Sequence, residues 1–115
     1  MAPSHIDLTP LEKLFEGDRL RMKEWIAVYL EEAPPLFRQL GVCQESGDAA
    51  GLVSLAHDLR PLAHYLGVPH VLELLAVIGQ LARTEGTPAC CGLVQELTSF
   101  SMNAETELRA FASEP

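Results

Sequence analysis

The chain has 115 residues, which is enough for one domain around a single hydrophobic core and too few for two. Eight basic residues against sixteen acidic ones give a net charge of −8, and no run of Lys or Arg offsets it. Because nucleic acids and anionic membrane surfaces are bound through clusters of positive charge, we expect neither as a partner.

Nothing in the chain has the pattern of a membrane span or a secretory signal. The richest apolar stretch, Val71 to Ala82, is interrupted by Glu73, Gly79 and Gln80, and it falls short of the roughly 18 to 20 apolar residues that a span requires. The first seven residues lack both the basic start and the apolar core of a signal peptide. We therefore expect a cytoplasmic protein.

Helix signals occur along the whole chain, and strand signals are nearly absent. Thr9, Pro10 and Glu12 predict a short helix over residues 9–16, with Thr9 as its cap and Pro10 at its first position. Gly17 ends this helix, and Asp18 is placed to cap a longer one. The apolar face of the longer helix is formed by Met22, Trp25, Ile26, Tyr29, Leu30 and Ala33.

Pro34 and Pro35 fall inside this second helical pattern. Each removes a backbone donor, and the ring crowds the preceding turn, so we predict a proline kink or a break near residues 34–35. Asp48 then caps a helix that runs to about Leu66, where Gly67 is placed to end it.

Two further helices complete the pattern. Pro69 opens one that ends at Gly86, and Thr87 with Pro88 predicts the capped start of the last. Their apolar faces comprise Val71, Leu74, Leu75, Ile78, Leu81 and Ala82 in the first, and Leu93, Leu97, Phe100, Ala104, Leu108 and Phe111 in the last. Four substantial helices joined by short loops predict an all-α fold, an antiparallel up-down four-helix bundle with a short extra N-terminal helix.

The helix after Asp48 presents a histidine to solvent. Its leucines, at positions 52, 55, 59, 62 and 66, cluster within roughly 80° around the helix axis. His57 points about 170° away from this stripe, with Arg60 and His64 within roughly 60° of it. The spacing therefore predicts an exposed imidazole beside a guanidinium one turn along.

This pairing suits the acceptance of a phosphoryl group. Imidazole is largely neutral near pH 7 and therefore nucleophilic, and the Arg60 guanidinium offers a planar set of donors for phosphate oxygens. Val53, one turn before His57 on the same side, is a candidate apolar docking contact for a partner. No Gly-rich phosphate loop or Gly-x-Ser-x-Gly elbow is present, so we expect no autonomous enzyme and no intrinsic cofactor.

A metal site is the alternative chemistry for these histidines. His64 lies seven residues after His57, and no histidine at the i+4 position and no nearby Cys or Glu completes a ligand set. We interpret His64 as a surface residue that flanks the site, and we expect no bound metal. A helical scaffold or a metal-binding bundle remains an alternative to a phosphoryl acceptor. The three cysteines, Cys43, Cys90 and Cys91, match no zinc spacing, and we expect them to be buried thiols.

The segment Ala56-His57-Asp58-Leu59-Arg60-Pro61, followed by Leu66-Gly67, resembles the motif of histidine-containing phosphotransfer (HPt) domains, which runs Ala-His-x-Leu-Lys-Gly and then Leu-Gly. Gly17-Asp18, Gly47-Asp48 and Leu81-Ala82-Arg83 also lie where such domains have similar residues. The resemblance covers roughly residues 8–112 of what we expect to be a single domain, 1–115, with no attached kinase or receiver module.

The resemblance implies a role for each motif residue. His57 would accept a phosphoryl group from an aspartate on a receiver domain, or from a sensor or hybrid histidine kinase, and pass it to a response regulator. Arg60 would stabilise the phosphoryl group, while Val53, Pro61 and His64 would contact the partner. Mg²⁺ would be held by the receiver domain, and the protein would be a monomeric carrier.

Two positions depart from the family pattern. Arg60 stands where the family has lysine, and Pro61 stands where it has glycine, whose small size lets a partner approach the imidazole. Pro61 crowds that approach and lacks the amide that would bond to the carbonyl of residue 57. These departures motivate a second hypothesis, a module on the same fold that docks and regulates a receiver or kinase without being phosphorylated.

Overall fold

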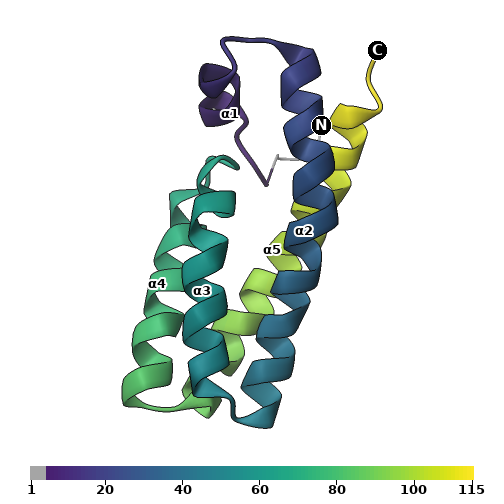
Figure 1. Ribbon diagram of the computed structural model, residues 1–115. Helices are drawn as coiled ribbons and strands as arrows, with labels where there is room; N and C mark the ends of the chain where they lie inside the picture. The colour runs from purple at the N-terminus through teal and green to yellow at the C-terminus, as the bar shows by residue number, and fades with distance from the viewer. Residues whose placement is uncertain (1–4) are drawn as a thin grey trace.

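The computed structural model of the protein describes residues 5–115, and this part of the chain is all-helical, without a strand. Its elements are α1 (Thr9–Leu14), α2 (Arg19–Ser46), α3 (Ala49–His64), α4 (Pro69–Thr84), a short 3-10 turn η1 (Thr87–Cys90) and α5 (Cys91–Ala112). The molecule measures 46 × 25 × 23 Å. The four long helices lie lengthwise, with α3 beside α4 and α2 beside α5, while α1 lies at one end (Figure 1). The predicted all-α class is confirmed.

The leucine stripe of α3 faces the core, as its spacing predicts. Leu52, Leu59 and Leu66 are fully buried, and Leu55 and Leu62 are half-buried against the same core. Burying one such side chain stabilises a fold by about 1.5 to 3 kcal/mol, so this stripe fixes the rotation of α3 about its own axis. That rotation decides which α3 side chains reach solvent.

The second helix passes through both prolines, so the break predicted there is wrong and the kink stays a prediction. The apolar face of α2 continues on both sides of Pro34, with Tyr29 and Ala33 buried before it and Phe37 and Leu40 buried after it. Burial of this face outweighs the roughly 3 kcal/mol that an interior proline costs a helix. The capping prediction for α2 is confirmed, because the Asp18 carboxylate accepts a hydrogen bond from the backbone amide of Arg21 at 3.2 Å.

The start of α1 differs from the prediction. Thr9 is the first helical residue and not the cap, and α1 ends at Leu14. The Asp7 carboxylate accepts hydrogen bonds from the Thr9 hydroxyl at 2.6 Å and from the Thr9 amide at 2.9 Å. These two bonds lower the pKa of Asp7 below its usual value. The N-cap of α1 is therefore Leu8, one residue before Thr9, and its side chain makes no cap hydrogen bond.

The last helix also starts later than predicted. Thr87 is buried and begins the 3-10 turn η1 instead of capping a helix, and α5 begins at Cys91. The Thr87 carbonyl accepts a hydrogen bond from the Gln44 side chain at 3.4 Å, which ties the turn to α2. The tight turn lets Thr87 and Cys90 pack inward while the chain reverses direction.

One cysteine was predicted wrongly. Cys43 and Cys90 are buried, and burial raises the pKa of both thiols, but Cys91 is exposed. Cys90 ends the turn η1 and Cys91 begins α5, and the step of about 100° between them turns Cys91 away from the core at this position.

Candidate functional site

The candidate site lies on α3, which begins with a satisfied cap and ends in a glycine turn. The Asp48 carboxylate accepts a hydrogen bond from the Gly51 amide at 2.8 Å, and Gly67 has a φ of +72° just after the helix. With the leucine stripe buried between these ends, His57 is exposed near the middle of the helix. Arg60 and His64 are exposed as well, so the predicted orientation of all three is confirmed.

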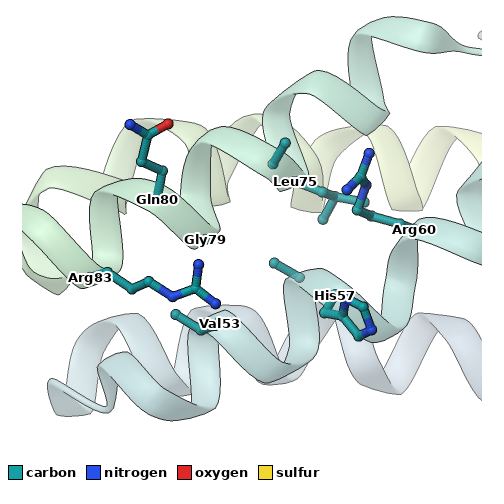
Figure 2. Close-up of a pocket in the computed structure, with 9 residues that line it drawn as sticks. Val53, His57, Arg60, Leu75, Gly79, Gln80 and Arg83 are labelled. Atoms are coloured by element: carbon teal, nitrogen blue, oxygen red, sulfur yellow. The ribbon is translucent and has the colours of Figure 1, made fainter.

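His57 and Arg60 border a hollow between α3 and α4 with a volume of about 350 Å³. It is lined by Val53, Ala56, His57 and Arg60 from α3 and by Leu75, Ala76, Gly79, Gln80 and Arg83 from α4. Figure 2 shows the two walls and the residues that project from them. Val53 is half-buried in the α3 wall, which places the predicted apolar contact beside His57.

Neither His57 nor Arg60 is engaged elsewhere. Within residues 5–115, neither side chain takes part in a hydrogen bond or an ion pair, and no carboxylate lines the hollow. The imidazole lone pair is therefore open to attack an electrophile. The Arg60 guanidinium has all its N–H donors available for an anion.

A second, more open hollow of about 270 Å³ also borders His57. It is lined by His57, Arg60, Pro61, His64 and Leu72. The structure therefore brings Pro61 and His64 to the same face as His57, as the sequence predicts. The His64 ring also meets the edge of the Tyr65 ring, with the centroids 4.9 Å apart.

Pro61 lies inside α3, four residues after His57, and is exposed. Proline has no backbone N–H, so the carbonyl of His57 lacks its regular helical partner. This leaves a carbonyl acceptor on the helix surface, next to the imidazole. The ring also adds bulk where a partner would approach.

Sequence reasoning missed the α4 wall of the hollow. Gln80 and Arg83 are exposed and line it, although neither was singled out as a site residue. The signal for this wall is Gly79, which interrupts the apolar stretch of α4. A Cβ added at Gly79 would meet no atom within 4 Å, so the missing side chain leaves open space against α3.

Among the described residues, no group of three or more His, Cys, Asp or Glu side chains is arranged to hold a metal ion. No helix in this range is long and apolar enough to cross a membrane. The site combines an exposed imidazole with an arginine that has no partner among the described residues, both on the rim of an open hollow. No protein-family model, no curated protein and no solved structure matches the chain.

Proposed function

We propose that the protein is a histidine phosphotransfer protein. It accepts a phosphoryl group on His57 from the phosphoaspartate of a receiver domain, or from a hybrid kinase, and relays it to a response regulator. The observation that carries this proposal is the exposed, unpartnered His57 in the middle of a bundle helix, with the free Arg60 one turn along.

The chemistry at His57 needs no cofactor from this chain. The lone pair of an unprotonated ring nitrogen forms the N–P bond, while the P–O bond to the partner's aspartate breaks and its electron pair leaves with the carboxylate. The reverse step onto a second receiver restores the imidazole. Mg²⁺ would be supplied by the receiver domain, so the protein acts as a carrier and not as an autonomous enzyme.

Arg60 supports both the transfer and the product. A phosphorylated imidazole carries up to about two negative charges, and a guanidinium one helical turn away offsets part of this charge. Arginine binds phosphate oxygens through a planar fork of donors, whereas the lysine of the HPt motif would supply a point charge.

The fold supports the same proposal. In Figure 1 the chain direction alternates from α2 to α5, which fits an antiparallel up-down four-helix bundle with α1 as the extra N-terminal helix. This is the architecture that the resemblance to HPt domains implies. We propose that the protein works as a monomer in the cytoplasm, where a receiver domain docks over His57, Val53, Pro61 and His64.

The test is transfer from a labelled receiver. Incubation with phosphorylated receiver domains should give an acid-labile, base-stable label on the protein. The label should be lost in His57→Gln and kept in His64→Gln, a matched change of the other exposed histidine on α3. The proposal is wrong if a broad panel of receivers gives no label, or if the label survives in His57→Gln.

Pro61 favours a second candidate function, a module that binds a receiver or kinase without accepting phosphate. Its exposed ring stands beside His57 and restricts the approach of a partner. This function predicts that His57→Ala keeps full receiver affinity and full cellular effect. It also predicts that Pro61→Gly does not convert the protein into an acceptor, whereas a carrier hindered by Pro61 would accept phosphate faster after this change.

A further inference from the structure

A separate groove runs between α2 and α5. It has a volume of about 450 Å³ and shares no lining residue with the two hollows at His57. Sites that bind small ligands have volumes of about 300 to 1,000 Å³, so this groove has room for one. No step of the proposed phosphotransfer uses it. The groove is therefore a candidate for a second binding function.

The groove carries one positive and one negative side chain on the same helix. Arg38 and Glu45 line it from α2, and both are exposed. Within residues 5–115, neither side chain takes part in a hydrogen bond or an ion pair. They are seven residues apart, which places them on one face of α2 and about 10.5 Å apart along its axis. The groove therefore offers two opposite charges, both without a partner in this range, at a spacing that the helix sets.

Gly41 lies between the two charges and keeps the middle of the groove open. Its φ is not in the left-handed region, and a Cβ added there would meet no atom within 4 Å. Glycine inside a helix is less stable than alanine, and no contact within the described chain requires it at this position. Across the groove, α5 contributes Gln95 and Ser99, whose amide and hydroxyl groups can form hydrogen bonds to a ligand.

An extended peptide of three residues matches these features. An extended chain spans at most about 3.3 to 3.6 Å per residue, so three residues reach about 10 to 11 Å. This length equals the spacing of Arg38 and Glu45 along α2. The free ends of such a peptide carry opposite charges, a carboxylate for the guanidinium and an ammonium for the Glu45 carboxylate. The peptide groups between the ends can pair with the side chains of Gln95 and Ser99.

We propose that the groove between α2 and α5 is a binding site for short peptides with free ends, and that tripeptides fit it best. The peptide carboxylate lies at Arg38, its ammonium group lies at Glu45, and its backbone passes over Gly41. Recognition depends on the two charged ends and on the length between them, so peptides of different sequence are accepted. This function does not require His57 to react, and its test is independent of phosphotransfer.

Trialanine is the probe for this groove, because it has both charged ends and no charged side chain. Amide chemical shifts of the protein are followed during titration with trialanine at constant pH and ionic strength. Saturable shifts should appear around Gly41 and Gln95, and none around His57. Dialanine spans only about 7 Å and reaches one charge at a time, so it should bind about two- to fivefold more weakly. The absence of saturable shifts at the groove with trialanine would overturn the proposal.

Blocked peptides assign each end of the ligand to its side chain. Arg38→Gln should weaken trialanine binding about two- to fivefold, the loss expected for one exposed ionic contact, and should leave binding of C-terminally amidated trialanine unchanged. Glu45→Gln should weaken trialanine binding by a similar factor and leave binding of N-acetylated trialanine unchanged. Arg21→Gln removes the same charge as Arg38→Gln from an exposed residue outside the groove and is the control. Equal losses for free and blocked peptides, or an equal loss in Arg21→Gln, would show a general effect of surface charge and contradict the proposal.

A steric variant tests where the peptide lies. Gly41→Leu fills the middle of the groove without changing any charge, so trialanine binding should be lost. Gly79→Leu adds the same side chain on α4, outside this groove, and should leave trialanine binding unchanged. Unchanged binding in Gly41→Leu, or an equal loss in both variants, would place the peptide elsewhere and overturn the proposal.

Discussion

Two regions of the molecule use the same kinds of charged side chains in opposite ways. Around the N-terminal segment and the end of α5, which we call the clasped end, the charges are paired. The His5 ring meets the Glu107 carboxylate at 3.0 Å, and Arg19 reaches Glu114 while lying over the Phe111 ring at 4.7 Å. On the α3–α4 face, which we call the open face, Arg60 and Arg83 border a hollow without any partner among the described residues.

The difference separates charged side chains that contribute to the stability of the fold from charged side chains that stay available to a ligand. An exposed ion pair stabilises a fold by only about 0 to 1 kcal/mol, so leaving two arginines unpaired on the open face costs the fold little. The N–H donors of the same two arginines have no partner among the described residues, so they can still form hydrogen bonds to a ligand. The clasped end, by contrast, combines its pairs with backbone contacts and so contributes to folding.

The largest effect on stability is expected from adding a side chain at Gly67, which packs against Asp7 of the clasped end. Gly67 has a φ of +72°, and a Cβ there would lie 2.1 Å from the Asp7 carbonyl oxygen. Gly67→Ala must strain the backbone and displace residues near Asp7, whose amide donates to the Leu66 carbonyl at 2.7 Å. We expect the free energy of unfolding to fall by about 2 to 4 kcal/mol, measured by urea denaturation.

Gly47→Ala is the matched control for this change. Gly47 has a φ of +78° after α2, but a Cβ there would meet nothing within 4 Å. It should therefore show the cost of the left-handed backbone alone, about 1 kcal/mol. Equal losses in the two variants would mean that the contact between Asp7 and Gly67 does not stabilise the fold.

A stabilising change is expected at Tyr29, in the core between the two regions. Its hydroxyl is buried without a hydrogen-bond partner among the described residues, while its ring stacks on Trp25 at 5.5 Å between the centroids. Tyr29→Phe removes a desolvated polar group and keeps the stacked ring. The free energy of unfolding should rise by about 1 to 2 kcal/mol near pH 7.

The pH dependence of this variant checks the cause. Burial, with a smaller contribution from Glu105, raises the pKa of Tyr29 above its usual value of 10.0. Below pH 10 both the folded and the unfolded state keep the phenol proton. Above it the unfolded state ionises first, so the wild-type protein loses stability as pH rises toward the folded pKa. The advantage of Tyr29→Phe should therefore grow above pH 10, and a difference that stays constant from pH 7 to 11 would contradict a buried neutral phenol.

A smaller gain is expected on the open face. Gly79 lies in the interior of α4 with free space around its Cα, so Gly79→Ala should raise the free energy of unfolding by about 0.5 to 1 kcal/mol. Gly41→Ala in α2, also with free space, should give a similar gain. Only the change at Gly79 should also narrow the hollow and slow transfer from a receiver. If both variants transfer at the same rate, the α4 wall is not used.

Helical periodicity accounts for much of what the sequence predicted. The leucine stripe of α3 fixed the outward direction of His57 and Arg60, because a repeat of three and four residues defines one face of a helix. The caps at Asp18 and Asp48 were also found from sequence, since an Asp before an apolar repeat has one local partner.

The missed features depend on contacts between segments distant in sequence. The residues around Thr9 match the local cap pattern. The start of α1 depends instead on Asp7, whose amide donates to the distant Leu66 carbonyl and whose carboxylate accepts from the Thr9 amide. Arg83 belongs to a segment that resembles the HPt pattern, but its place on the same hollow as His57 follows only from the packing of α4 beside α3. Local patterns predict which way one helix faces, and they do not predict what its neighbour contributes to a shared hollow.

The smallest effect is expected at Asp7, and only in acid. Hydrogen bonds from the Thr9 hydroxyl and amide lower the pKa of Asp7 below 3.8, so its ionised form favours the folded state. This contribution is present above the unfolded pKa and is lost as pH falls through the lower folded pKa. Asp7→Asn should remove that part of the pH dependence, so that the stability of the variant falls less steeply than that of the wild type below pH 4.

Thr9→Val is the control that separates the two bonds at Asp7. It removes the hydroxyl donor at 2.6 Å and keeps the amide donor at 2.9 Å, so its acid dependence should lie between those of the wild type and Asp7→Asn. The measurement is the urea midpoint between pH 2.5 and 6. Identical acid profiles for all three proteins would show that α1 is not fastened through Asp7, and the clasped end would then depend on its ion pairs and on Gly67 alone.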